Sequence, residues 1–211
     1  MKHLSSVLLL FVTAAFAGAI GAPAYGQSLE KRAKQFKVYL GSLQYSTFLA
    51  QKALDNDKLL PPACAKRRLT GRRQLFDVFQ TPRFIRTRKV PIRGAWAERV
   101  EVARCGRTVW HNIYLSASPK RGIHAVAGFP GTTITRVGTQ VAAGKKLIAA
   151  VRARIPRCRK MDILNTARIT RPAKAGSSWR EVWTVYACGR SVRRTMVFTP
   201  AGKTSRVKIL R

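Results

Sequence analysis

Acidic residues are scarce in this sequence. The 211 residues include 8 aspartates and glutamates against 41 lysines and arginines, and the formal net charge is +33. Glycosidic cleavage needs two carboxylates that flank one bond of the substrate. Glu98 and Glu101 are near neighbours, but strand alternation sends them to opposite faces, and Asp77 and Asp162 are isolated. The sequence therefore does not favour carboxylate chemistry.

Histidine and catalytic motifs are also scarce. The chain has 3 histidines, the last of them His124, and it contains neither G-x-S-x-G nor C-x-x-C. A serine or cysteine nucleophile needs an adjacent base, and a structural zinc site needs closely spaced cysteines or histidines. We therefore predict a protein that is not an enzyme and has no catalytic residues, no metal and no cofactor.

Long apolar runs are missing except at the N-terminus. Lys2 and His3 precede an apolar run over residues 7–20, and small residues follow as far as Gly26. This order predicts a cleaved signal peptide over residues 1–26 and a periplasmic or secreted protein. An uncleaved anchor is the alternative, because the run is nearly long enough to cross a bilayer.

One motif occurs twice. Residues 96–109 and 179–192 both read W-x-E-x-x-x-V-x-x-C-G-R-x-V without a gap. So many matches between unrelated segments are not expected by chance. We therefore predict a tandem repeat, with the first unit over residues 27–127 and the second over residues 128–211.

Each copy of the motif predicts a β-hairpin. Apolar residues alternate before the Cys-Gly pair and again after it. A turn with an even number of residues places Val102 opposite Val109 and Val185 opposite Val192, so that the apolar residues share one face. We assign structural roles to the tryptophan, glutamate and turn glycine of each copy, which are Trp96, Glu98, Gly106, Trp179, Glu181 and Gly189.

The two glutamates of the motif lie on this otherwise apolar face. Glu98 is diagonal to His111 in the expected register, and Glu181 is diagonal to Arg194. A partly buried carboxylate can act as an acid or base near neutral pH. The alternative, which we prefer, is a glutamate paired with that cation at the edge of a core. Trp183 opposite Arg194 likewise indicates a packing or cation–π pair.

The four cysteines are of two kinds. Cys105 and Cys188 belong to the hairpin turns, whereas Cys64 and Cys158 lie in P-x-C contexts. Four cysteines allow three pairings. One cysteine of each kind per predicted unit favours Cys64–Cys105 and Cys158–Cys188, as expected outside the cytoplasm.

The remaining pattern predicts an α+β fold. Apolar spacings of three and four predict helices over residues 28–60 and 141–155, with strand candidates at 74–79, 83–90, 123–127, 162–170 and 205–210. Each unit is then a helix followed by a small antiparallel β-meander, with one disulfide. Residues 128–133 form the joint, either as a plain turn or as an anion site built from exposed amides.

The positive charges occur in clusters that suit phosphate and carboxylate groups, because arginine binds both in a bidentate way. We predict anion binding by Arg67, Arg68, Arg72, Arg73, Arg83, Arg86, Arg88, Lys89, Arg152, Arg154, Arg157, Arg159, Arg190, Arg193 and Arg194.

The expected ligand is a polyanion of the cell envelope, such as anionic lipid, lipopolysaccharide or a wall polymer, with peripheral membrane association. An acidic protein partner is the alternative, and a basic surface without a dedicated ligand is another. Phe84 and Trp110 lie near cations and could stack bases. No nucleic-acid motif is present, however, so we do not expect nucleic acid as the ligand. Nucleic-acid binding and an uncharacterised hydrolase are kept as further alternatives. We expect a monomer or a weakly associating protein.

The second copy of the motif carries a resemblance. Residues 179–189, W-R-E-V-W-T-V-Y-A-C-G, together with residues 198–202, residues 130–132 and Cys158, resemble small secreted proteins of Gram-negative bacteria with no assigned function. The resemblance covers about the second half of the chain, and the arginine load and the duplication depart from it. It implies export and a disulfide, and it implies no mechanism.

Overall fold

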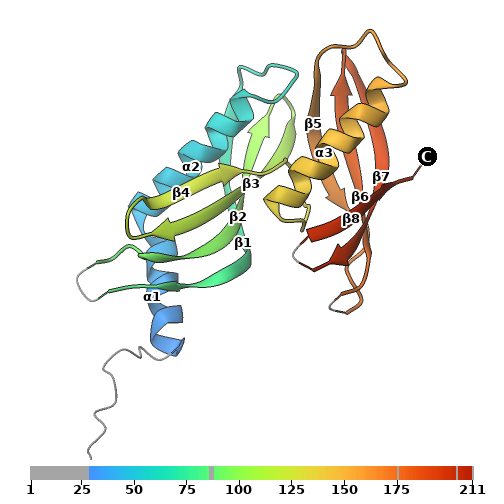
Figure 1. Cartoon of the computed structure of the whole chain (residues 1–211). Coiled ribbons are helices and arrows are strands. Elements are labelled where there is room, and N and C mark those ends of the chain that lie inside the picture. Colours follow the sequence, from blue (N-terminus) through green and yellow to red (C-terminus); the bar gives the residue numbers. More distant parts are fainter. Residues whose placement is uncertain (1–28, 86–87, 175, 203, 211) are drawn as a thin grey trace, which may run out of the picture.

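The computed structural model describes residues 29–85, 88–174, 176–202 and 204–210. The expected signal peptide and Arg86 lie outside the described residues. Within them the chain forms two four-stranded antiparallel sheets, sheet 1 and sheet 2, and three helices (Figure 1).

The strands follow one another in simple order within each sheet. Sheet 1 has the order β1-β2-β3-β4, and sheet 2 has the order β5-β6-β7-β8. The first part of the chain contains α1 (Leu29–Gly41), α2 (Leu43–Lys58), β1 (Arg67–Arg83), β2 (Arg93–Arg104), β3 (Arg107–Ser118) and β4 (Gly122–Ala127). The second part contains α3 (Val137–Arg152), β5 (Met161–Arg168), β6 (Trp179–Ala187), β7 (Arg190–Ala201) and β8 (Thr204–Ile209).

The predicted fold class is wrong. We expected a tandem repeat in which one helix precedes a small meander, whereas the protein is mostly β and its two halves differ. Two helices precede sheet 1, because the predicted long helix is interrupted at Ser42, whose hydroxyl accepts from the Tyr45 amide and caps α2. β1 has 17 residues where β5 has 8. Register shifts against β2 let β1 continue as one bulged strand as far as Arg83.

The predicted hairpin registers are confirmed. Val102 lies opposite Val109, and Val185 lies opposite Val192. In each turn the cysteine and the glycine both have positive φ, at 40° and 79° for Cys105 and Gly106. This geometry is that of a two-residue turn whose twist matches the flanking strands. A Cys-Gly pair therefore fixes which face of each hairpin is buried.

Both predicted disulfides are confirmed as well. Cys64 is bonded to Cys105, and Cys158 is bonded to Cys188. Disulfides of this kind are typical of proteins that fold in an oxidising compartment. None of the helices in the described ranges is both long and apolar enough to span a membrane.

Each sheet has its own hydrophobic core. In Figure 1, α1 and α2 lie behind sheet 1, and α3 lies in front of sheet 2. The core of sheet 1 joins helix residues to the apolar face of the first hairpin and includes Phe36, Tyr39, Leu49, Trp96, Val102 and Ile113. The core of sheet 2 is built in the same way and includes Leu147, Val151, Trp183, Val185, Met196 and Phe198.

The two motif glutamates are buried in these cores, and neither forms an ion pair with a cation of the described residues. Glu98 is 1% exposed and accepts a hydrogen bond from the hydroxyl of Tyr45 on α2. The Tyr45 oxygen in turn accepts from the indole of Trp96 at 2.9 Å. Burial raises the pKa of Glu98, and the hydrogen bond from Tyr45 offsets only part of this rise. Ionisation of Glu98 therefore destabilises the folded state.

Glu181 holds the segment between the two sheets. Its carboxylate is fully buried and accepts from the indoles of Trp179 at 2.9 Å and Trp183 at 2.7 Å. The hydroxyl of Thr133 and the amide of Ile134 also donate to it, at 3.0 and 3.2 Å. Four donors can keep a buried carboxylate stable without a counter-ion, and here they fix the entry into α3.

The first prediction concerns the Glu98→Gln variant. Because the folded-state pKa of Glu98 is raised, the wild-type protein loses stability as the pH rises above the ordinary glutamate value of 4.5. Glutamine keeps an acceptor for Tyr45 and carries no charge. We expect the free energy of unfolding of the variant, relative to wild type, to be higher at pH 8 than at pH 4 in denaturant titrations.

The Glu98→Ala variant is the control for this prediction. It leaves the Tyr45 hydroxyl without its acceptor, and it should lower the free energy of unfolding by about 1–3 kcal/mol. A difference between Glu98→Gln and wild type that is the same at both pH values would contradict the account of Glu98.

Candidate anion-binding surface

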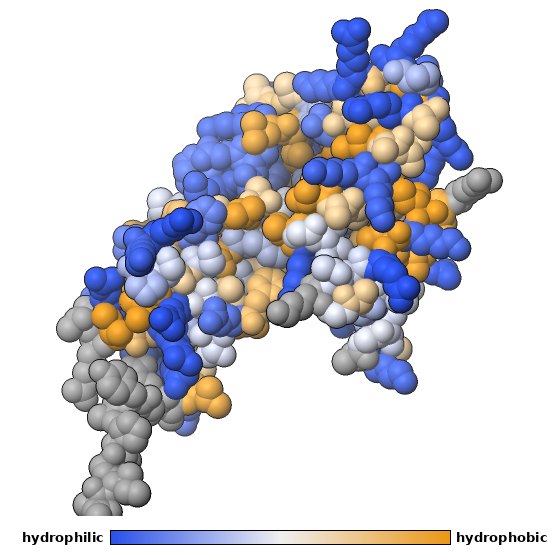
Figure 2. Space-filling view, in the orientation of Figure 1, coloured by the Kyte–Doolittle hydropathy of each residue, from blue (hydrophilic) through white to orange (hydrophobic). Residues whose placement is uncertain are grey.

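The predicted anion-binding residues occupy three parts of the described structure. The first group lies on β1 and in the segment that joins it to β2, the second lies at the end of α3 and in the loop to β5, and the third lies on β7. Most of these side chains are exposed, and Arg67 and Arg194 are half-buried. Figure 2 shows hydrophilic side chains projecting all around the outline of the molecule. The arginines therefore spread over both sheets instead of converging on one groove.

One hollow nevertheless gathers several cations. A cavity of about 800 Å³ lies at the first hairpin turn, and we call it the turn cavity. Its lining contains five cationic residues and no acidic one: the charged members are Lys66, Arg67, Arg68, Arg104 and Arg107.

Strand pairing brings these cations together. Arg67 at the start of β1 lies opposite Arg104 at the end of β2, and Arg104 lies opposite Arg107 across the turn. Three arginines therefore stand side by side in one row across three strands. The amide of Cys105 donates to the carbonyl of Lys66, and the disulfide from Cys105 to Cys64 holds this end of the sheet closed.

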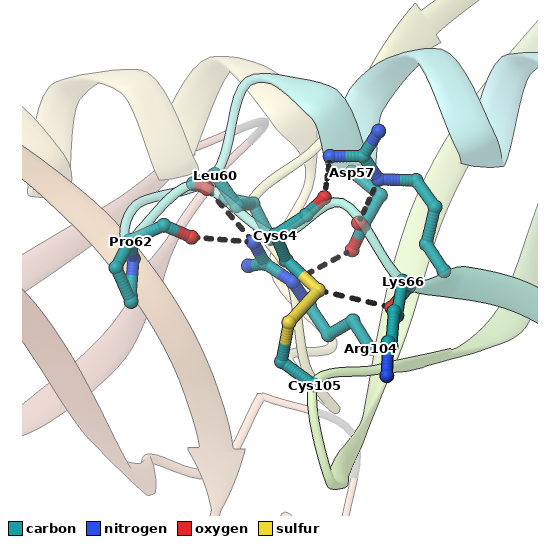
Figure 3. Close-up of a disulfide and its surroundings, with 8 residues drawn as sticks. Asp57, Leu60, Pro62, Cys64, Lys66, Arg104 and Cys105 are labelled. Atoms are coloured by element: carbon teal, nitrogen blue, oxygen red, sulfur yellow. Dashed lines mark hydrogen bonds and ion pairs between the residues drawn. A yellow bond between two sulfur atoms is a disulfide. The ribbon is translucent and has the colours of Figure 1, made fainter.

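A buried carboxylate contacts two of these arginines, Arg67 and Arg104 (Figure 3). Asp57, in the last turn of α2, is fully buried, and its oxygens lie 3.2 Å from Arg67 Nε, 3.4 Å from Arg104 Nε and 3.1 Å from His111 Nε2. Burial alone would raise the pKa of Asp57. The hydrogen bond from His111 and the charges of Arg104, His111 and Arg67 outweigh that effect and lower it. Asp57 is therefore an ionised anchor between α2 and sheet 1.

Arg104 is buried more deeply than any other lysine or arginine in the described ranges. It is 2% exposed, and Nη2 donates to the carbonyls of Leu60 at 2.9 Å and Pro62 at 2.7 Å. Nη1 has no hydrogen-bond partner among the described residues. Burial lowers the pKa of Arg104. One carboxylate, Asp57, thus faces two arginines, so the turn cavity keeps an excess of positive charge.

Burial of other acidic residues adds to the basic character of the surface. Glu101 is 4% exposed and lies 3.1 Å from Arg72 Nη1. Four of the eight carboxylates are therefore buried: Asp57, Glu98, Glu101 and Glu181. The buried cations of the described residues are only Arg99 and Arg104. The surface is consequently more one-sided in charge than the composition indicates.

Some predicted contacts are not formed. His111 contacts Asp57 instead of Glu98. Arg194 lies opposite Trp183 in register, but its Nη1 donates to the carbonyl of Arg193 at 2.7 Å. Both motif glutamates therefore find neutral partners where we expected cations.

The expected aromatic and backbone sites are also occupied by internal contacts. Phe84 is 8% exposed and packs against Tyr39. Trp110 lies under the guanidinium of Arg72, at 5.3 Å from the ring centre. In the joint, the amide of Gly131 donates to the carbonyl of Trp110 at 2.7 Å, and the amide of Thr132 donates to that of Thr166. The joint therefore offers these amides to the protein instead of an anion.

Sequence reasoning placed Lys66 in the same cluster as Arg67 and Arg68, but it missed two residues of the turn cavity, Arg104 and Arg107. A signal for Arg104 was present, because alternation from Trp96 through Val102 places residue 104 on the buried face. A buried arginine needs an acidic partner, and Asp57 ends the preceding helix. No sequence rule, however, placed β1 beside this end of the hairpin.

Comparison with family models, with curated proteins and with solved structures gives no match. The resemblance to small secreted proteins stays a prediction, and function is inferred from the residues themselves.

The second prediction concerns the Asp57→Asn variant. It leaves the buried Arg104 without its counter-ion, and we expect the free energy of unfolding to fall by about 3–5 kcal/mol at pH 7. The lowered pKa means that Asp57 stabilises the protein above the ordinary value of 3.8, and that this contribution is lost as the pH falls through the folded-state pKa. The difference from wild type should therefore shrink in acid, as measured by thermal or denaturant unfolding.

Asp55→Asn is the matched control, because Asp55 lies on the same helix and forms an exposed pair with Lys58. Its removal should change stability little at either pH. Equal effects of the two substitutions would contradict the anchoring role of Asp57.

Proposed function

We propose that this chain is an exported, non-catalytic protein that binds acidic components of the cell envelope through its arginine-rich surfaces. The observation that carries the proposal is the use of half of the carboxylates inside the fold. Arginines and lysines of the described surface therefore face solvent with few acidic neighbours. The exposed acidic residues are Glu30 and Asp77, with Asp55 and Asp162 half-buried.

Such a surface repels itself and attracts polyanions. Closely spaced like charges raise the free energy of the free protein, and a bound polyanion removes that cost. The fold itself supplies little compensation, since the exposed ion pair of Asp55 with Lys58 contributes little. Binding to an extended anionic surface therefore stabilises the protein as well as localising it.

The distribution of the arginines favours an extended ligand. Arg72 and Arg73 lie on β1 of sheet 1, Arg193 lies on β7 of sheet 2, and Arg154 and Arg157 lie in the loop after α3. No single small anion can contact all of these positions. A lipid surface or a charged polymer can engage them together, with many weak contacts adding up.

Export is part of the proposal. Two disulfides favour an oxidising compartment. The expected signal peptide over residues 1–26 would deliver the chain to the periplasm or to the outside of the cell, where anionic lipids, lipopolysaccharide and wall polymers are the abundant acidic ligands.

The third prediction is that binding depends on salt. The mature protein should sediment with vesicles that contain anionic lipid, and not with purely zwitterionic vesicles, at an ionic strength of about 0.01 M. At about 1 M, where the Debye length is about 3 Å, this binding should be lost. Retention of the bound protein at high salt would contradict the proposal and would favour a shape-matched acidic protein partner.

Charge variants sharpen this test. Replacing Arg154, Arg157 and Arg193 by glutamine should weaken binding and reduce its salt dependence. A control that replaces the exposed neutral residues Ser116, Ala153 and Ser191 by glutamine should bind as the wild type does. Equal effects of the two variants would show that the arginines are not the binding groups.

A further inference from the structure

The two hairpin turns share one geometry but differ in part of their charge. Lys66 and Arg107 at the first turn correspond to Lys160 and Arg190 at the second, whereas the other cations of the turn cavity have no such equivalent. Cys105 and Gly106 have φ values of 40° and 79°, and Cys188 and Gly189 have values of 47° and 84°. Each turn is tied by a disulfide to the chain that enters the first strand of its sheet. The backbone requirements of the two turns are therefore the same.

The other residues around the two turns do not match. Beside the first turn, Arg67 lies opposite Arg104, whereas the equivalent pair beside the second turn is Met161 with Ala187. One residue further on, Arg68 occupies the place that Asp162 takes in the other sheet. The second turn thus forms without these arginines, so folding of such a turn does not require them.

The cations of the turn cavity also carry a free-energy cost. Arg104 is 2% exposed and has an unmatched donor at Nη1, and an unmatched buried donor is destabilising. Like charges from Lys66, Arg68 and Arg107 line the same cavity and repel one another. Asp57 is the one acidic residue of the described structure in contact with this group, and it is shared by Arg67 and Arg104.

We propose that the turn cavity is a specific site for a phosphorylated ligand. A phosphate monoester carries up to two negative charges and three terminal acceptor oxygens, which suits the exposed cationic side chains of the lining, Lys66, Arg68 and Arg107. Arg104 and Arg67 are less exposed and are held by internal contacts. A carboxylate has one charge and two acceptors, so it matches this site less well. A cavity of about 800 Å³ has room for more than the phosphate, as in a phosphorylated sugar or a lipid head group.

This inference rests on the proposed function in one respect, namely that the physiological source of the phosphate is an envelope component. The site itself can be tested without that assumption. Arg68 and Arg107 are exposed and take no part in the buried cluster, so they can be changed without disturbing the fold.

The fourth prediction uses inorganic pyrophosphate as the probe, in calorimetric titrations of the full mature protein at about 0.15 M salt. Wild type should bind about one equivalent. Arg68→Gln with Arg107→Gln should weaken binding by at least about 10-fold, which is about 1.4 kcal/mol. The matched control is Arg190→Gln with Arg193→Gln, which removes the same charge around the second turn and should leave the affinity unchanged.

Three results would overturn the proposal: no measurable binding by wild type, several equivalents bound without a distinct first site, or equal losses in both double variants. Lys66→Gln with Arg68→Gln provides a second variant and should also weaken binding. A monocarboxylate sugar acid, titrated under the same conditions, should bind more weakly than pyrophosphate, and equal affinity would contradict the choice of phosphate.

Vesicles distinguish the possible sources of the phosphate and separate this proposal from the general function. At equal surface charge, vesicles with phosphate-monoester lipid should bind wild type more tightly than vesicles with phosphodiester lipid, and the turn-cavity variant should lose this preference. Pyrophosphate binding without that preference identifies a soluble phosphorylated ligand. Salt-sensitive binding to both kinds of vesicle with no pyrophosphate site would sustain the general function and refute the turn cavity as a site.

Discussion

The structure depends on the burial of its few carboxylates. Each one ties a central hairpin to a neighbouring element. Asp57 joins α2 to sheet 1 through Arg104 and His111, and Glu98 accepts from Tyr45 of the same helix. Glu101 pairs with Arg72 of β1, and Glu181 holds the entry to α3. In a chain with 8 acidic residues, this use inside the fold leaves little negative charge for the surface.

The fold thus adds to the positive surface charge that the composition already gives the chain. A basic composition does not by itself mean a basic surface, because surface ion pairs can neutralise it locally. Here the internal contacts use half of the available carboxylates and bury only two of the described cations. The same holds at the turn cavity, where Asp57 anchors α2 and is shared by two arginines, so that positive charge remains in excess. The buried carboxylates therefore affect both the stability of the fold and the charge of the surface.

Local features of the fold could be predicted from the sequence, and long-range features could not. Alternation and the Cys-Gly pair determine the hairpin register, since an odd turn would scatter the apolar residues over both faces. The length of β1 could not be predicted, because its exposed and bulged residues lack a period of two. The two halves are therefore unlike: sheet 1 is preceded by two helices and sheet 2 by one, and β1 is about twice as long as β5. The shared motif gives no sign of this difference. Glu98 was expected to find a cation, but its partner is Tyr45, which is supplied by a helix 53 residues away.

Carboxyl footprinting tests the central claim most directly. A water-soluble carbodiimide with an amine labels accessible carboxylates, and mass spectrometry of peptides measures the rate at each position. The account predicts fast labelling of the native protein at Glu30 and Asp77. It predicts protection, lost on denaturation, at Asp57, Glu98, Glu101 and Glu181. Native-state labelling of these four residues at the rate of Glu30 would contradict it, because the carboxylates would then face solvent instead of joining the elements of the fold.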